Sequence, residues 1–137
     1  MSNIKVFEND LPNDLDLSNE KFIGLDNEAL GLVLGRDPLT LVQLGLESKN
    51  FYLVKLNRET YKAPNLVRVL SNNKTQFIMH YARQDLMWLK YHLNVKPKNI
   101  FCTKVASKIA RTASSFHGYK DLVKELCGKD ISKKEQQ

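Results

Sequence analysis

Two carboxylates, Asp26 and Glu28, stand two residues apart at the end of the apolar run 21–25. If that run is a β-strand that leads into them, side chains at i and i+2 point to the same face and Asn27 points away. Two like charges this close repel and raise each other's pKa, and a divalent cation between them relieves the repulsion. Mg²⁺ prefers such oxygen ligands. A metal site and a plain acidic turn are both consistent with this triplet alone.

A third carboxylate, Asp85, comes after the apolar segment 75–79 and at the start of the amphipathic segment 84–93. It could be a third oxygen ligand, or a carboxylate that stabilises the positive end of a helix. His80 lies between the two segments, where it either ends a strand as a hydrogen-bonded histidine or lines a site. The apolar pattern places Trp88 in the core.

The elements that would carry these side chains follow from the apolar patterns. Strands are predicted at 21–25, 39–46, 51–56 and 75–79. Helices are predicted at 63–70, 84–93, 102–111 and 119–127. The first three strands are close enough in sequence to form an antiparallel meander. Strands followed by alternating helix and strand predict an α/β fold, a mixed β-sheet flanked by helices.

Apolar residues at helical spacing in the last two helices predict faces that pack inward. These residues are Val105 and Ile109, and then Leu122, Val123 and Leu126. Gly128 follows the second of these helices, at a position where left-handed backbone commonly ends a helix.

The composition bounds the class of protein. A chain of 137 residues that is 42% hydrophobic fits a single domain, 1–137. The net charge of +6 is uneven, since residues 1–37 have a balance of −5 and residues 38–137 a balance of +11. The basic part fits a polyanionic partner such as nucleic acid, and a solvated lysine-rich surface is the alternative.

Several other classes are disfavoured by the sequence. The sequence has no apolar run of about 18 residues, so no membrane span is predicted. The polar N-terminal segment does not resemble a signal peptide. Cys102 and Cys127 are interpreted as reduced thiols in a cytoplasmic protein. The sequence contains no glycine-rich phosphate loop and no serine nucleophile elbow.

Four segments together resemble a known family. The first two are 22–32, a strand that ends in Asp-x-Glu, and 77–86, which contains His80 and Asp85; the others are 101–108 and 117–126. They are similar to the ribonuclease D branch of the DEDD 3′-5′ exonucleases, and within it to the short bacterial single-domain members. That family usually has threonine where this chain has Asn27.

The resemblance implies a ribonuclease H-like fold and hydrolysis of RNA phosphodiester bonds from the 3′ end with two divalent ions, Mg²⁺ or Mn²⁺. Asp26 would bridge both metals, Glu28 would hold the metal that activates water, and Asp85 would help to hold the second. The expected substrate is a single-stranded RNA 3′ end, with DNA as a further candidate. Residues expected to contact it are Ala29, Leu30, His80, Arg83 and Gln84.

The resemblance also raises a question about the C-terminus. Family members continue beyond a segment like 133–137 into a Ser-Asp-Trp segment and a helix with Tyr-x-x-x-Asp. We therefore expect a C-terminally truncated domain that lacks the last family helices and whose activity is impaired, or is completed by a second polypeptide. The alternatives are an inactive nucleic-acid-binding remnant of a split ribonuclease D gene, and a basic interaction module with an incidental acidic cluster.

Overall fold

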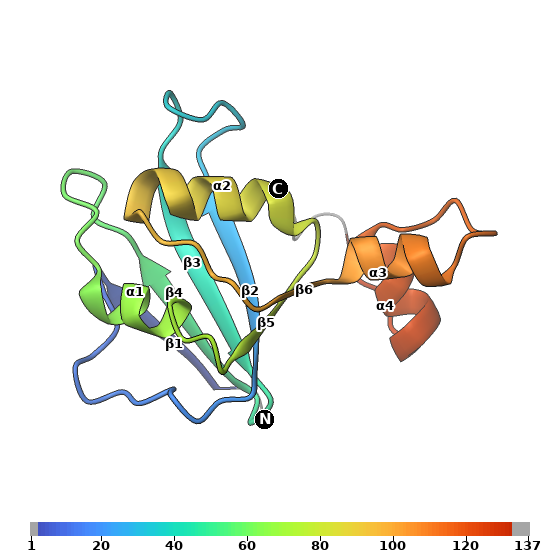
Figure 1. Cartoon of the computed structure of the whole chain (residues 1–137), viewed down its shortest axis with the longest axis horizontal. Coiled ribbons are helices and arrows are strands. Elements are labelled where there is room, and N and C mark those ends of the chain that lie inside the picture. The colour runs from blue at the N-terminus through green and yellow to red at the C-terminus, as the bar shows by residue number, and fades with distance from the viewer. Residues whose placement is uncertain (1–2, 133–137) are drawn as a thin grey trace.

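Six strands form one mixed sheet in the order β1-β4-β3-β2-β5-β6 in the computed structural model, which describes residues 3–132 (Figure 1). The strands are β1 (Asn3–Glu8), β2 (Phe22–Ala29), β3 (Leu39–Leu46), β4 (Asn50–Lys55), β5 (Gln76–Met79) and β6 (Ile100–Cys102). The helices are α1 (Pro64–Leu70), α2 (Ala82–Leu93), α3 (Thr103–Ala110) and α4 (Tyr119–Cys127). The helices within residues 3–132 are all too short or too polar to cross a membrane.

The predicted meander is confirmed, because β2 pairs antiparallel with β3 and β3 pairs antiparallel with β4. The remaining pairs are parallel: β5 with β2, β6 with β5, and β1 with β4. Strands β1 and β6 were not predicted. Both join the sheet by pairing with strands that are not their neighbours in sequence through a tight turn, and β6 has only three residues, so neither gives a local turn signal.

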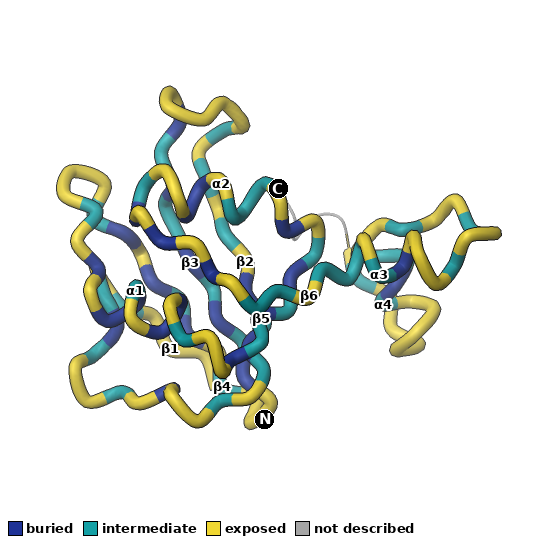
Figure 2. Tube along the Cα trace, viewed as in Figure 1, coloured by how far each residue is buried: buried dark blue, intermediate teal, exposed yellow. Residues whose placement is uncertain are grey.

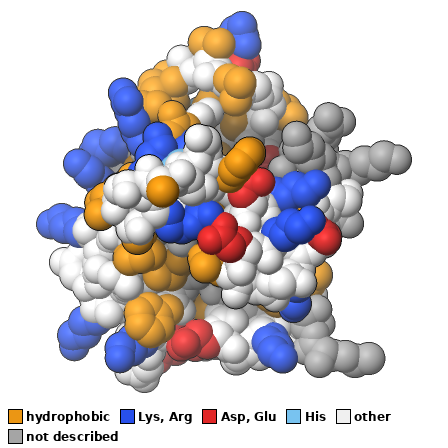
Figure 3. Space-filling view, turned by 90° about the vertical axis from the view of Figure 1, so that its right-hand side faces the viewer, with side chains coloured by type: hydrophobic (Ala, Val, Ile, Leu, Met, Phe, Trp, Pro, Cys, Tyr) orange, Lys and Arg blue, Asp and Glu red, His pale blue; other side chains and the backbone are white. Residues whose placement is uncertain are grey.

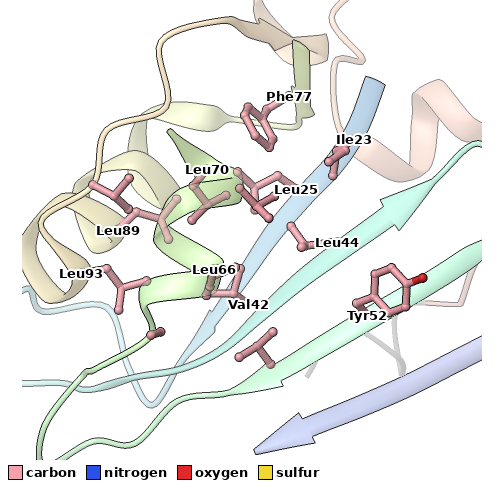
Figure 4. Close-up of a cluster of buried hydrophobic side chains, with 14 of the residues drawn as sticks. Ile23, Leu25, Val42, Leu44, Tyr52, Leu66, Leu70, Phe77, Leu89 and Leu93 are labelled. Carbon is pink, nitrogen blue, oxygen red and sulfur yellow. The ribbon is translucent and has the colours of Figure 1, made fainter. Parts of the chain in front are cut away.

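The hydrophobic core lies between one face of the sheet and helices α1 and α2. Alternate residues of β2 and β3 point into it, and Ile23 and Val42 are fully buried. Figure 4 shows Leu66 and Leu70 of α1 and Leu89 of α2 directed at these strand residues. Burying each such side chain contributes about 1.5–3 kcal/mol, so this layer fixes α2 against β2.

The opposite face of the sheet is open. The same alternation of β2 places Gly24, Asp26 and Glu28 on this face, away from the core. A groove of about 490 Å³ runs over it, with Gly24 and its β3 partner Gly45 in the floor and Tyr119 in a wall. Gly24 and Gly45 have no side chains at this register position, and the ring of Phe51 from β4 lies against Gly45 there.

Helices α3 and α4 stand beside the sheet instead of covering it (Figure 1). The bounds of both helices match the prediction closely, but the prediction that Val105, Ile109 and Leu126 pack inward was wrong. Their exposed fractions are 53%, 73% and 70%, and Figure 2 shows this pair of helices largely exposed. From the end of the molecule that carries the pair, basic side chains are scattered among apolar and acidic ones (Figure 3). Leu122 is buried, as predicted, so the apolar faces of this helix pair are packed only in part within residues 3–132.

The β2–β3 loop is organised by Asp37, whose carboxylate accepts hydrogen bonds from the Val33 amide and from two nitrogens of Arg36. The Arg36 guanidinium holds the pKa of Asp37 down at about 2. Gly31 passes close to this carboxylate with a φ of 143°. A Cβ added to Gly31 would lie 2.1 Å from the Asp37 Oδ2 atom, so only glycine fits there.

Replacing Gly31 with alanine should therefore lower the free energy of unfolding by about 2–4 kcal/mol, because a clash is added to the backbone strain. The matched control is Gly128→Ala, which has a φ of 65° but no atom within 4 Å of the added Cβ. That control should lose only about 1–2 kcal/mol from the left-handed backbone. Urea unfolding of both variants measures the difference. Equal losses of unfolding free energy would show that the Asp37 carboxylate moves aside without loss of stability.

Candidate metal centre

The first two carboxylates lie inside a strand. Asp26 and Glu28 lie at the end of the first predicted strand, as expected, and β2 extends beyond the predicted 21–25 through both of them to Ala29. Both residues are exposed on the open face, as the period of two requires, and Asn27 faces α2. The register with β3 shifts between Glu28 and Ala29, and such a bulge increases the local twist and re-aims side chains.

Residues of β3 hold Glu28 in place. Gln43, which lies opposite Asp26 in the register, donates a hydrogen bond from Nε2 to the Glu28 carboxylate at 3.5 Å. The Thr40 hydroxyl donates to the Glu28 main-chain carbonyl at 2.9 Å. Sequence reasoning missed both residues, because only the strand register brings them beside the Asp-x-Glu segment.

Asp85 is brought to β2 by helix α2. The helix begins at Ala82, two residues earlier than predicted, so Asp85 lies in its first turn. Asn27 donates a hydrogen bond from Nδ2 to the Asp85 main-chain carbonyl at 3.0 Å. This bond joins the start of α2 to the part of β2 that carries the other two carboxylates.

The three carboxylates interact through their charges. Burial and then the negative charges of Asp26 and Glu28 together raise the pKa of Asp85 to about 7. Burial is also the main cause that raises the pKa of Asp26, although its side chain is accessible from the open face. Burial and then the charge of Asp26 raise the pKa of Glu28. The charge of Asp26 thus acts on both Glu28 and Asp85, and the charge of Glu28 acts on Asp85.

The donor chemistry fits a hard divalent cation. Three carboxylates supply the oxygen ligands that Mg²⁺ prefers, and a cation among them would offset their mutual repulsion. Within residues 3–132, however, no three His, Cys, Asp or Glu side chains gather closely enough to form a ready ligand cluster. Mg²⁺ keeps several water ligands, so a site of this kind does not need a complete shell of protein atoms.

His80 stands beside the carboxylates in a fixed orientation. Its Nδ1 is 2.9 Å from the Thr103 hydroxyl oxygen, and that hydroxyl donates to the Met79 carbonyl at 3.2 Å. A hydroxyl has one hydrogen, so when Thr103 donates it to the Met79 carbonyl, Nδ1 donates to Thr103 and Nε2 of the neutral ring is left as an acceptor. Burial and then the charge of Lys104 lower the pKa of His80, which favours this neutral form.

The sequence did not predict that Thr103 and Lys104 would lie beside His80. They begin α3, which follows β6, and β6 pairs with β5 just before His80. The Lys104 ammonium lies 4.2 Å from the ring centre of Tyr81, and Tyr81 has a φ of 61°. The parallel pairing of β5 and β6 is the feature that brings these residues together.

A hollow of about 180 Å³ opens beside Glu28 and Asp85. Of the residues predicted to contact substrate, Ala29, His80 and Gln84 line it. Leu30 and Arg83 do not line this hollow, and both are exposed. Trp88, which is buried as predicted, closes its inner side.

Comparison with known proteins gives a family match. The sequence model of a family described as 3′-5′ exonuclease matches residues 6–137. Nothing matches among curated proteins.

Solved structures of nucleases share the fold. NrnC from Brucella melitensis bound to pGG is 36% identical, with a TM-score of 0.89 over 96% of this chain and 64% of that chain. The same protein with bound Mg²⁺ is 37% identical, with a TM-score of 0.89 over 95% of this chain and 64% of that chain. RNase D from Escherichia coli is 19% identical, with a TM-score of 0.71 over 88% of this chain and 31% of that chain. The predicted ribonuclease H-like mixed sheet is confirmed, and the chain spans about 64% of the length of NrnC.

The raised Asp85 pKa predicts how stability depends on pH. The folded protein binds the Asp85 proton more tightly than the unfolded chain, so stability falls as pH rises from 3.8 to about 7. Asp85→Asn removes the charge, and in EDTA it should be more stable than the wild type at pH 8, by about 1–2 kcal/mol after solvent screening. Near pH 4 the difference should vanish.

The control for that experiment is Asp37→Asn, because the Asp37 pKa is lowered to about 2. Its contribution to stability is present above pH 3.8 and is lost as pH falls toward 2, so this variant should be less stable than the wild type at pH 8. Urea unfolding across the pH range measures both trends. An Asp85→Asn variant that is no more stable than the wild type at pH 8 would show that the three carboxylates do not repel as described.

Proposed function

Because this chain belongs to the 3′-5′ exonuclease family, we propose that it removes nucleotides from the 3′ end of single-stranded RNA. We propose that Asp26, Glu28 and Asp85 are its catalytic carboxylates and hold two divalent ions, Mg²⁺ or Mn²⁺. The observation that carries this proposal is electrostatic. The charges of Asp26 and Glu28 from β2 act on Asp85 of α2 and, together with its burial, raise the pKa of Asp85 to about 7. This repulsion costs stability unless a cation offsets it.

The residues of the chain have separate tasks in this reaction. When bound, the metal ions would lower the pKa of the attacking water and stabilise the leaving 3′ oxygen. Gln43 and Thr40 orient Glu28 from the neighbouring strand. Thr103 fixes the His80 ring so that Nε2 can accept a hydrogen bond from the terminal nucleotide or from water.

Substrate contacts are proposed around the hollow beside Glu28. Ala29, His80 and Gln84 line it and would contact the terminal nucleotide. Leu30 and Arg83, which are exposed nearby, would contact the chain on its way in. The binding of pGG by NrnC, at 36% identity, supports a ribonucleotide substrate, and the basic balance of residues 38–137 supports a polyanion.

A second polypeptide that supplies a helix with a fourth carboxylate is a further part of the proposal. Two observations support a partner on the open face. The first is the groove of about 490 Å³, which is lined by Asp26, Gly24 and Gly45. The second is the apolar surface that Val105 and Ile109 of α3 expose. We propose a cytoplasmic location, in line with Cys102 and Cys127 as free thiols.

One observation favours a second candidate function, an inactive protein that binds nucleic acid. The described residues 3–132 contain no ready cluster of three metal ligands. Such a protein would bind RNA through its basic surface without cleaving it.

The test is degradation of a 5′-labelled single-stranded RNA by the purified chain with Mg²⁺ or Mn²⁺, followed on a sequencing gel, with a DNA of the same sequence in parallel. Successive shortening from the 3′ end is expected with metal and not with EDTA. Asp26→Asn should lower the rate by about 100-fold or more, because a metal-bridging charge is lost. Asp14→Asn, an exposed residue of the N-terminal segment, should cleave like the wild type.

Three outcomes separate the candidates. Undiminished cleavage by Asp26→Asn would remove the carboxylates from the mechanism. Binding of RNA without cleavage, with or without added partner helix, would favour the inactive binding protein. Faster cleavage of DNA than of RNA would reassign the substrate and leave the site intact.

A further inference from the structure

The side chain of Asn27 lies on a different face of the sheet from those of its two neighbours. Asn27 lies between Asp26 and Glu28 in β2, but its side chain points to the other face of the sheet, toward α2. There its Nδ2 donates to the main-chain carbonyl of Asp85 at 3.0 Å. One short segment of strand therefore carries two carboxylates on one face and contacts the backbone of the third from the other.

This bond is the single hydrogen bond between β2 and α2 in the part of the chain that the structure describes. Leu25 of β2 and Leu89 of α2 both belong to the apolar core between the sheet and the helices. Apolar packing holds a helix against a sheet. Because it is non-directional, it only weakly resists sliding of the helix along the sheet. A hydrogen bond to the Asp85 carbonyl does have a direction, and it acts on the residue that carries the carboxylate.

The energetics argue against a purely structural role for this amide. The Asn27 Oδ1 atom is buried without a hydrogen-bond partner, and an unsatisfied buried acceptor costs about 1–3 kcal/mol. The Asp85 carbonyl lies within a helix, where the amide four residues later is its regular partner. A leucine of similar size at position 27 would avoid the buried acceptor and bury apolar surface instead.

We propose that Asn27 is a positioning residue that sets Asp85 against Asp26 and Glu28. The proposal rests on the proposed function, because it assumes that the three carboxylates hold a divalent cation. The amide keeps the first turn of α2 in register with β2, so that the third carboxylate stays beside the other two despite their repulsion. A side chain that lacks the Nδ2 donor would leave the fold intact and allow Asp85 to move away.

The test compares metal affinity with stability in Asn27→Leu. Mn²⁺ binding to the full chain is measured from the EPR signal of free Mn²⁺, and the free energy of unfolding is measured by urea in EDTA. The expected result is a weakening of Mn²⁺ binding by about tenfold or more, the usual effect of removing a group that orients a metal ligand. The free energy of unfolding should be unchanged or higher. A residue with a structural role alone would change stability and not metal affinity.

The matched control is Asn72→Leu. Asn72 also donates from its side-chain amide to a distant main-chain carbonyl, that of Ser18 at 3.2 Å, and it lies in another part of the molecule, beside the groove formed by residues 13–19 and the end of α1. This variant should lose stability and keep the Mn²⁺ affinity of the wild type. Asn27→Ala is the second variant if leucine does not fit, and it should weaken Mn²⁺ binding in the same way.

The outcomes are distinguishable. Wild-type Mn²⁺ affinity in a folded Asn27→Leu or Asn27→Ala variant would overturn the role of Asn27 and leave the proposed metal site standing. A wild-type chain that binds no Mn²⁺ would overturn the proposed metal site, and the role of Asn27 with it. Weaker binding in both Asn27 variants, with the Asn72 control unaffected, would support the positioning role.

Discussion

Repulsion among three carboxylates is the constraint around which this structure is built. Asp26 and Glu28 are exposed and Asp85 is half-buried. Burial and then the charges of Asp26 and Glu28 raise the pKa of Asp85 to about 7. Like charges at such a site oppose folding, so the rest of the chain must hold them together. The apolar layer between the sheet and α1 and α2 supplies that energy, and it lies on the face away from the charges.

Because side chains of β2 alternate between the two faces of the sheet, the apolar residues that stabilise the fold and the charged residues lie on opposite faces. Ile23 and Leu25 of β2 are buried in the core, and the next residue of the opposite parity, Asp26, faces the open side. Asn27 then returns to the core side and contacts α2 at Asp85. A strand with period two can thus anchor itself in the core, carry two carboxylates on its other face and bond to the backbone of Asp85 within a few residues. A helix could not divide neighbouring residues between two faces in this way.

Features that depend on local pattern could be predicted from the sequence. The shared face of Asp26 and Glu28 follows from the period of a strand, and the bounds of α4 follow from its apolar spacing and from Gly128, whose φ is 65°. The placement of Trp88 in the core was also correct. Each of these depends on residues that are close in sequence.

Features that depend on distant segments could not be predicted. The pairing of β1 with β4 and of β6 with β5 has no signal in either strand alone, and with β6 come Thr103 and Lys104, which surround His80. Helical spacing also showed that α3 has an apolar face, but not that Val105 and Ile109 would be exposed. Amphipathicity predicts that a face can pack, and only the tertiary structure decides what lies against it.

The most direct test of coupled carboxylates is proton release when Mn²⁺ binds at pH 7. It is measured by isothermal titration calorimetry in two buffers that differ in ionisation enthalpy. With a pKa of about 7, Asp85 is about half protonated before binding, so about half a proton should be released per chain, and Asp85→Asn should release much less. Binding of Mn²⁺ without net proton release would contradict the coupling of the three carboxylates.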